Sequence, residues 1–411
     1  MRPIFTLALF LSVFCAGAQT PEWLIFNTSN SDFPSDYVYA IAVDTRGNKW
    51  IGTSSGLVRM KGFDITVFDQ SNSGIPANGV GSLAAAPDGS IWMGTLGGGL
   101  ARFDGNNSWT VYSTRNSMLP DNRVSALAID GNGIVWAGTG GGLVKMSGAQ
   151  MTVFTSANSG LPDNGIFNIA VDHDGVLWMS VGMYLGPYKG LVSFDGASWK
   201  VFDTQNSDLP SEEIYGIAIG TDNQKWLGTK EGLAEFDGNT SWNIYDFANS
   251  GLPSDYVTRL TVDADNVKWV GTDQGVSRYD GTDWELWTPF DSPLPSKNVF
   301  ALAVDGDKNK FIGTRGGGLA VFNENGIVSS VTDPVYQRSS TIYPNPANEM
   351  VYWRGAVNAE KIVLKNATGQ YLGDFPQPER GEFDVSNLPA GVYFLEIFSG
   401  RNVFLEKLIV R

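Results

Sequence analysis

The chain has 411 residues and a formal net charge of −15, so its long-range field repels nucleic acid backbones and anionic membrane surfaces. Its single histidine and single cysteine provide too few ligands for a zinc site, and the only cysteine, Cys15, lies within the first twenty residues, which makes a cysteine nucleophile an unfavoured interpretation. The 49 glycines, 13 tryptophans and 12% aromatic content favour an all-β fold with many tight turns.

The first residues predict a secretory signal peptide over residues 1–18. Arg2 precedes an apolar run over residues 4–14, and Ala16-Gly17-Ala18 provides an A-x-A cleavage site. Lipidation of Cys15 is the less favoured alternative, because Phe14 stands where a lipoprotein signal needs a small residue. The mature chain would then lack cysteine and rely on packing alone. We expect no transmembrane segment in it.

Residues 19–332 are organised by a repeat whose centre reads Trp-x-Gly-Thr. Five full copies and two looser ones begin at Trp50, Trp92, Trp136, Trp178, Trp226, Trp269 and Phe311. A proline lies sixteen residues before each of these aromatic residues, at Pro34, Pro76, Pro120, Pro162, Pro210, Pro253 and Pro295. Self-similarity at a period of 42 to 48 residues predicts a repeat architecture.

Each repeat predicts four short antiparallel strands, which in the first copy cover residues 38–43, 50–53, 56–60 and 65–68. A lone unit of this size cannot bury both of its faces, so seven copies predict a seven-bladed β-propeller. A fourth-strand pattern at residues 23–26 precedes the first blade, and the last repeat lacks a good one. We therefore expect the N-terminal strand to close the last blade.

The first strand of each blade is expected to lie innermost. The sixth residue after each proline is small in most copies, as a crowded axis requires, and Arg259 breaks this pattern. Two interpretations of Arg259 are open. It forms an ion pair with a carboxylate of a neighbouring blade, or it faces a ligand.

One end of the ring is the candidate recognition face. The loops before the first strand and after the second strand are expected to emerge there, and the latter gains six residues in the fourth blade. Variable loops on a rigid scaffold are typical of binding sites. The candidate ligand-binding residues are Tyr37, Arg123, Tyr184, Tyr188, Lys189, Glu213, Lys230, Glu231, Tyr256, Arg259, Asp273 and Arg315. Tyr184 and Tyr188 would suit stacking on sugar rings, and solvated loop residues are the alternative for the whole set.

Other chemistry is less favoured. The aspartate-rich turns at Asp172, Asp263 and Asp305 resemble calcium loops but lack a clear distal acidic ligand, so we interpret them as hairpin turns and expect no metal and no cofactor. His173 lies in such a turn, at the end opposite the candidate face, which argues against histidine-dependent catalysis. Paired carboxylates among Glu212, Glu213, Glu231 and Asp273 leave an acid–base enzyme open.

The repeats resemble the two-component regulator propeller family, on the evidence of Leu252-Pro253, the core over residues 130–139 and Gly232-Leu233. Propellers of that family often form the periplasmic sensor of hybrid histidine kinases. This chain departs from the sensor architecture, since it has neither a membrane span nor a kinase. We therefore do not extend the signalling role to it.

A second domain is expected over residues 341–411, after a linker at residues 333–340. Alternating apolar runs there predict a small Ig-like β-sandwich. Its motifs are Tyr343-Pro344-Asn345-Pro346, Leu388-Pro389 followed by Gly391 and Tyr393, and a basic-apolar finish at Lys407. They are similar to the C-terminal sorting domain of the type IX secretion system. The resemblance implies recognition by that machinery, export across the outer membrane, cleavage near the linker, and release or surface anchoring.

These patterns together predict a secreted or cell-surface binding or scaffold propeller, not an enzyme, that recognises a glycan or protein ligand. A carbohydrate-active hydrolase or lyase with acidic residues near the axis is one alternative, and a purely structural surface protein is another. Nucleic acid is not an expected partner.

Overall fold

The computed structural model describes residues 22–183, 186–327, 335–336, 341–343, 345–354, 361–366, 371–374, 382–399 and 402–411. These residues fall into two compact units that divide between residues 328 and 329. Every regular element in the described ranges is a β-strand. Within them, no helix has the length and apolar character needed to cross a membrane. The expected signal peptide, with Cys15, lies outside the described residues.

Seven four-stranded antiparallel sheets make up the first unit. The first four sheets are β2 (Val38–Val43), β3 (Lys49–Thr53), β4 (Leu57–Lys61) and β5 (Asp64–Phe68); β6 (Val80–Ala85), β7 (Ile91–Thr95), β8 (Leu100–Phe103) and β9 (Trp109–Tyr112); β10 (Val124–Ile129), β11 (Val135–Thr139), β12 (Gly142–Ser147) and β13 (Gln150–Phe154); and β14 (Gly165–Val171), β15 (Leu177–Gly182), β16 (Tyr188–Phe194) and β17 (Trp199–Phe202). The last three are β18 (Ile214–Ile219), β19 (Lys225–Thr229), β20 (Gly232–Phe236) and β21 (Trp242–Tyr245); β22 (Val257–Val262), β23 (Lys268–Thr272), β24 (Val276–Tyr279) and β25 (Trp284–Trp287); and β26 (Val299–Val304), β27 (Lys310–Thr314) and β28 (Leu319–Phe322) with β1 (Trp23–Phe26).

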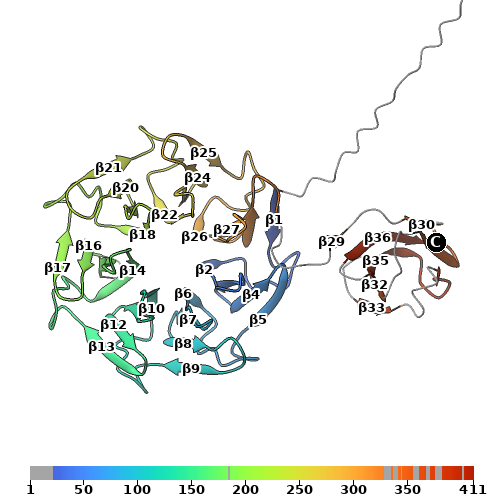
Figure 1. Ribbon diagram of the computed structural model, residues 1–411, viewed down its shortest axis with the longest axis horizontal. Coiled ribbons are helices and arrows are strands. Elements are labelled where there is room, and N and C mark those ends of the chain that lie inside the picture. Colours follow the sequence, from blue (N-terminus) through green and yellow to red (C-terminus); the bar gives the residue numbers. More distant parts are fainter. Residues whose placement is uncertain are drawn as a thin grey trace, which may run out of the picture. The chain divides into compact units, whose positions relative to one another are not determined.

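The sheets are the blades of a seven-bladed propeller. Figure 1 shows the first strand of each blade facing the centre of the ring and the fourth strand on its outside. This arrangement confirms the fold class predicted from the repeats. The second strand of every blade is buried along its whole length, because it is covered on both faces by neighbouring blades.

The Trp-x-Gly-Thr sequence is explained by packing between blades. A Cβ added to Gly52 would lie 2.7 Å from the carbonyl oxygen of Val80, on the innermost strand of the next blade. Only glycine leaves room for that strand. The threonine that follows turns inward, and the Thr53 hydroxyl donates a 2.8 Å hydrogen bond to the Gly56 carbonyl. The motif is therefore scaffold, as its constancy predicts.

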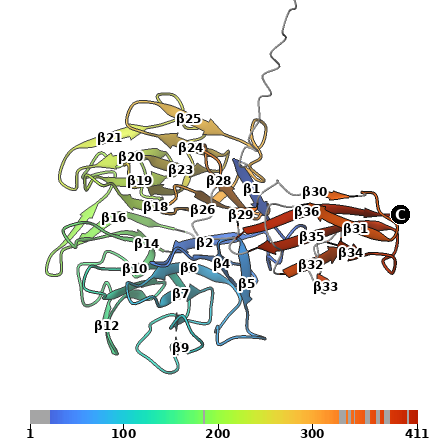
Figure 2. The same cartoon turned by 45° about the vertical axis from the view of Figure 1, so that its right-hand side comes forward.

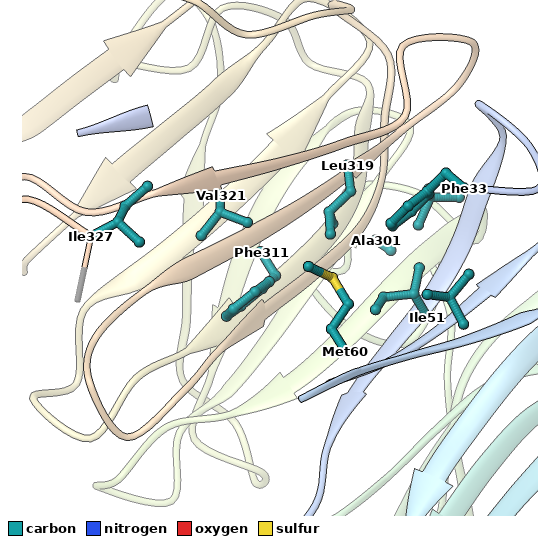
Figure 3. Packing of buried hydrophobic residues seen from close by; sticks show 10 residues of the cluster. Phe33, Ile51, Met60, Ala301, Phe311, Leu319, Val321 and Ile327 are labelled. Atoms are coloured by element: carbon teal, nitrogen blue, oxygen red, sulfur yellow. The ribbon is translucent and has the colours of Figure 1, made fainter. Parts of the chain in front are cut away.

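The ring closes where β1 pairs with β28. The pairing is antiparallel with Trp23 opposite Phe322, and the two rings stack with centroids 4.4 Å apart. Beside this sheet, Phe311, Leu319 and Val321 of blade seven face Ile51 and Met60 of blade one in a shared apolar cluster (Figure 3). The closure predicted from residues 23–26 is confirmed.

The second unit contains two sheets. One has the order β29 (Val335–Tyr336), β36 (Asn402–Val410), β35 (Gly391–Ser399), β32 (Lys361–Asn366) and β33 (Tyr371–Asp374), and the other β30 (Thr341–Tyr343), β31 (Met350–Arg354) and β34 (Glu382–Asp384) (Figure 2). Buried side chains that include Val351, Ile362 and Leu395 form its core. This is the expected small Ig-like sandwich. The two residues of β29 fall inside the segment predicted as a linker and pair with β36.

Candidate ligand pocket at the propeller axis

Each innermost strand carries a β-bulge at the same place. The register between first and second strands skips one residue, the fifth after the repeat proline. A bulge turns the extra side chain away from the regular ladder and re-aims it. The seven bulged residues are Tyr39, Gly81, Ser125, Phe167, Tyr215, Thr258 and Phe300.

A pocket of about 500 Å³ lies where these strands meet at the axis. Six of the seven bulged residues line it, and Arg259 takes the place of the seventh. Its wall is completed by Tyr188, at the start of β16, and by residues of the surrounding loops, among them Tyr37, Leu96, Arg123 and Arg315. Every blade therefore contributes, and the volume lies within the roughly 300–1,000 Å³ typical of small-molecule sites.

The sixth residue after the proline has a different place from the predicted one. It faces the innermost strand of the next blade, where Ser82 Oγ donates a 3.1 Å hydrogen bond to the Val124 carbonyl. Asn168 Nδ2 donates to the equivalent carbonyl, that of Ile214, at 3.2 Å. Small residues are needed there because two strands approach closely, and the residue that lines the pocket is the fifth in six blades, joined in blade four by the sixth residue, Asn168.

Blade six exchanges these two roles. Thr258, at the fifth position, is buried and its hydroxyl donates to the Val299 carbonyl of the next blade. Arg259, at the sixth position, is partly exposed and lines the pocket instead. A single exchange along β22 thus delivers a charged side chain to the part of the wall where the innermost strands of the other blades place their neutral bulged residues.

Arg259 is held by main-chain oxygens. Its Nη1 donates to the carbonyls of Tyr215, at 2.6 Å, and Thr258, at 2.7 Å. Among the described residues no carboxylate pairs with it, so the ion pair that the sequence left open is not formed there. Burial lowers the pKa of the guanidinium, which nevertheless stays protonated at neutral pH.

Aromatic rings and two further arginines line the same pocket as Arg259. The guanidinium of Arg315 lies 5.7 Å from the centre of the Phe300 ring, and the Tyr188 and Phe167 rings are 5.9 Å apart. Main-chain bridges join Tyr37 to Arg315 and Leu96 to Arg123 across blade boundaries. The loops predicted to form the recognition face therefore meet at one end of the ring. Of the predicted ligand-binding residues, Tyr37, Arg123, Tyr188, Arg259 and Arg315 converge on the pocket.

A polar cluster in blades five and six lies beside the pocket. Lys230 pairs with Glu213 at 2.7 Å, and the Tyr215 hydroxyl donates to the same carboxylate at 2.7 Å. Lys230 and Tyr215 hold the pKa of Glu213 below its usual range, and Glu213 raises that of Lys230. Burial, together with Tyr256 and Glu213, raises the pKa of Tyr215. Tyr256 packs on Tyr215 with ring centres 4.8 Å apart.

The other predicted residues do not reach the pocket. Glu231 is exposed and lines, with Glu212 and Glu213, a separate open groove of about 680 Å³. Asp273 lies outside both, with its Oδ1 buried and lacking a partner among the described residues. Lys189 belongs to β16 and is partly exposed, and Tyr184 lies outside the described residues.

The four aromatic residues that sequence reasoning missed are Tyr39, Phe167, Tyr215 and Phe300. A weak signal for them exists, because the fifth residue after each proline varies widely in size, from glycine to tyrosine. Regular alternation places successive side chains on opposite faces of a strand, and a bulge changes the direction of the extra residue, so its direction could not be deduced from the sequence. The bulge itself leaves no mark in the sequence.

At the opposite end of the ring, the carboxylates of the aspartate-rich turns are engaged by hydrogen bonds and ion pairs within the protein. Asp305 accepts the main-chain N–H groups of Asp307 and Asn309, and its other oxygen pairs with Lys49 at 2.9 Å. No group of three or more metal-binding side chains occurs among the described residues. The main-chain N–H of His173 donates to Asn223 in the neighbouring blade.

The motifs of the C-terminal unit meet around its last strand. The Asn345 side chain accepts the N–H of Ile409 at 2.9 Å, and Ala347, which follows Pro346, is bridged to Val410. Tyr393 is buried in the core, and its hydroxyl donates to the Pro389 carbonyl at 2.7 Å, with Leu388 packed nearby. Gly391 opens β35 opposite Val410. Tyr343 and Lys407 lie on strands β30 and β36, and Pro344 is outside the described residues.

Comparison with known families agrees with both resemblances. Residues 341–411 match the model described as secretion system C-terminal sorting domain. Residues 118–141 and 160–182 match the model described as two component regulator propeller. The chain thus combines propeller repeats of the two component regulator type with a C-terminal sorting domain. That domain indicates export to the cell surface or secretion, through contact with the secretion machinery. A search of curated proteins gives no match.

Solved structures share the fold. PorZ of Porphyromonas gingivalis, an essential bacterial surface component of the type-IX secretion system, is 19% identical, with a TM-score of 0.59 over 93% of this chain and 60% of its own. The extracellular domain of a protein assigned to the hybrid two component systems of B. thetaiotaomicron is 18% identical, with a TM-score of 0.61 over 95% and 57%. Virginiamycin B lyase from Staphylococcus aureus is 15% identical, with a TM-score of 0.59 over 73% and 98%. The chain thus spans 60% or less of the length of the first two of these proteins.

Proposed function

We propose that the propeller is a non-enzymatic binding module that recognises a glycan or protein ligand through the axial pocket. One observation carries this proposal. The same bulged position of the innermost strands, constant in geometry, bears tyrosine, glycine, serine and phenylalanine in different blades and points them into a single pocket. A repeated scaffold with blade-specific side chains at one site is suited to recognition.

The chemistry of the wall supports binding over catalysis. The described residues that line the pocket include no carboxylate, so the paired acids of a glycoside hydrolase do not meet there. Glu213, the best-placed acid nearby, has a pKa lowered by Lys230, whereas a general acid needs a raised one. Exposed tyrosine faces with a polar tip suit contacts with sugar rings or with protein side chains.

The proposal is tested by screening the purified protein against a glycan array and a panel of extracellular proteins. For any ligand found, Tyr188→Ala and Arg259→Ala are expected to weaken binding about 30-fold, the effect of a central contact. Phe290→Ala is the matched control, because Phe290 is 97% exposed and lies outside the pocket. Unchanged binding by both folded pocket variants would remove the axial pocket as the site.

A further inference from the structure

The axial pocket is a local reversal of charge in an acidic protein. The chain has 43 acidic and 28 basic residues, yet the described residues lining the pocket include three arginines and no carboxylate. The arginines come from three blades, Arg123 from blade three, Arg259 from blade six and Arg315 from blade seven. Cations gathered in a concave site focus their field on whatever enters it.

The charge of Arg259 is oriented by its neighbours but not cancelled. Its two hydrogen bonds go to main-chain carbonyls and both come from Nη1, so in the described part of the chain Nε and Nη2 keep donors for a ligand. Glu213, which contacts the pocket residue Tyr215, has its own counter-ion in Lys230. A guanidinium with a free edge binds a carboxylate or sulfate through two parallel hydrogen bonds.

Flat rings stand next to these cations. Tyr37 is 43% exposed at the mouth, where its main chain is bridged to that of Arg315. Tyr188, packed on Phe167, lines the opposite region of the same pocket. Ring faces stack on the apolar faces of pyranose rings, and tyrosine hydroxyls add hydrogen bonds. A volume of about 500 Å³ admits a short oligosaccharide and excludes a folded protein domain.

We propose that the pocket binds a short acidic saccharide, whose carboxylate or sulfate group pairs with Arg259 while its sugar rings stack on the tyrosines. This inference rests on the proposed function and specifies its ligand class. Arg123 and Arg315 at the mouth attract the anionic saccharide and contact its second acidic sugar unit. Affinity should therefore fall as salt is added, since the mouth is exposed to solvent.

Calorimetric titration of the purified protein separates the possible ligands. The probes are a galacturonic acid tetrasaccharide, which carries carboxylates, a heparin-derived tetrasaccharide, which carries sulfates, and neutral cellotetraose. At least one acidic probe is expected to bind about 100-fold more tightly than the neutral one, through two charge-assisted contacts. Which acidic probe binds identifies the anionic group. Equal affinity for neutral and acidic probes would overturn the assignment.

Variants test the role of each arginine. Arg315→Gln and Arg123→Gln, at exposed positions, should each weaken acidic-probe binding about tenfold. Arg259→Lys should weaken it at least as much, because lysine keeps the charge but loses the bidentate edge. Arg46→Gln is the control, because it makes the same charge change in an exposed turn at the opposite end of the ring. This variant should bind the acidic probe as tightly as the parent does.

The two proposals fail in different ways. Tight binding of a neutral glycan that Tyr188→Ala abolishes and the arginine variants leave intact would reject the acidic class and keep the pocket as a binding site. If Arg46→Gln weakened binding of an acidic probe as much as Arg315→Gln does, the probe would be attracted by charge alone. This result would overturn the assignment to the pocket. A glycan and protein screen without any ligand would reject the proposed function itself.

Discussion

The repeat tryptophans differ in one hydrogen bond. In four blades an aspartate six residues earlier accepts the indole N–H, as Asp172 does from Trp178 at 2.9 Å. Blade five has Gly220 at that position, and the Trp226 indole nitrogen is buried without a partner among the described residues. Both indoles lie under a lysine, Lys225 over Trp178 and Lys268 over Trp226.

This difference gives a matched pair of substitutions. Trp178→Phe and Trp226→Phe remove similar volume, but only the first loses an indole hydrogen bond and leaves Asp172 short of a donor. Trp178→Phe is therefore expected to lower the free energy of unfolding by about 1–3 kcal/mol more than Trp226→Phe. Urea denaturation of both variants measures it. Equal losses would mean that the indole bond adds nothing to stability.

At the scale of single residues, the sequence indicated some of the pocket and missed the rest. Arg259 could be identified because it breaks a pattern of small residues. Its partners could not, since the two carbonyls that hold it belong to a bulge and to the preceding blade. Tyr39 and Phe300 were missed because strand alternation gives the wrong direction for a side chain displaced by a bulge.

At the scale of strands, neighbouring blades are joined by buried lysines at the start of the second strand. Lys225 reaches back to Asp172 of the preceding blade at 3.2 Å, with both side chains at most 5% exposed. Lys49 makes the same contact with Asp305 across the closure of the ring. Val135 and Ala86 occupy these places between blades two and three, where a pocket of about 600 Å³ opens instead.

The buried pair predicts a dependence of stability on pH. Burial alone would raise the pKa of Asp172, but hydrogen bonds from Trp178 and Val176 and the charge of Lys225 bring it below its usual value. Because the pKa of Asp172 is lower in the folded state, its ionised carboxylate stabilises the fold fully at pH values above its pKa in the unfolded chain, about 3.9. This stabilisation is lost as the pH falls through its pKa in the folded state.

Asp172→Asn is thus expected to be less stable than the parent at pH 7, with a difference that shrinks between about pH 5 and pH 2. Urea unfolding at a series of pH values measures this. Asp208→Asn, in an exposed loop, is the control, and the difference between its free energy of unfolding and that of the parent should be the same at every pH. If the stability difference between Asp172→Asn and the parent were also independent of pH, the Asp172 carboxyl would not link folding to pH.

The N-terminal strand gives the third prediction. Deleting residues 19–27 leaves β28 without its outer partner and exposes Phe322, which is 3% exposed in the closed blade. We expect the Tm to fall by several degrees, because main-chain hydrogen bonds and a stacked ring pair are lost together. Thermal melts followed by circular dichroism measure the effect. A truncated protein that melts with the parent would contradict the closure.

The element pattern was the most predictable level of the structure. The spacing from proline to tryptophan, the glycine turns and the orphan strand at residues 23–26 were enough for seven blades and their closure. Strand ends shifted by a residue, as with β4, which ends at Lys61. The sequence predicted that the loops of the candidate face share one end of the ring, but which of their side chains line a common pocket depends on the three-dimensional approach of seven separate strands.

At the scale of the whole molecule, the sorting domain indicates export of the protein to the cell surface or its secretion. We expect deletion of residues 341–411 to leave the propeller folded but retained inside the cell, since the motifs that meet at β36 are then absent. Fractionation of a host that has the secretion machinery, followed by immunoblotting, tests this. Mass spectrometry of the exported parent should find its C-terminus near the predicted linker at residues 333–340. Export of the truncated form would contradict the role of the tail.

The closure of blade seven makes completion of the ring depend on synthesis of the whole propeller. The ring is sealed by pairing residue 23 with residue 322, so translation must pass through all seven blades before the circle can close. The sorting motifs are made directly afterwards. A polypeptide interrupted before β28 contains the closing strand β1 but lacks its partner β28, and it also lacks the sorting motifs. We therefore expect a prematurely terminated product to have an open ring and to remain inside the cell, because it lacks the sorting domain as well.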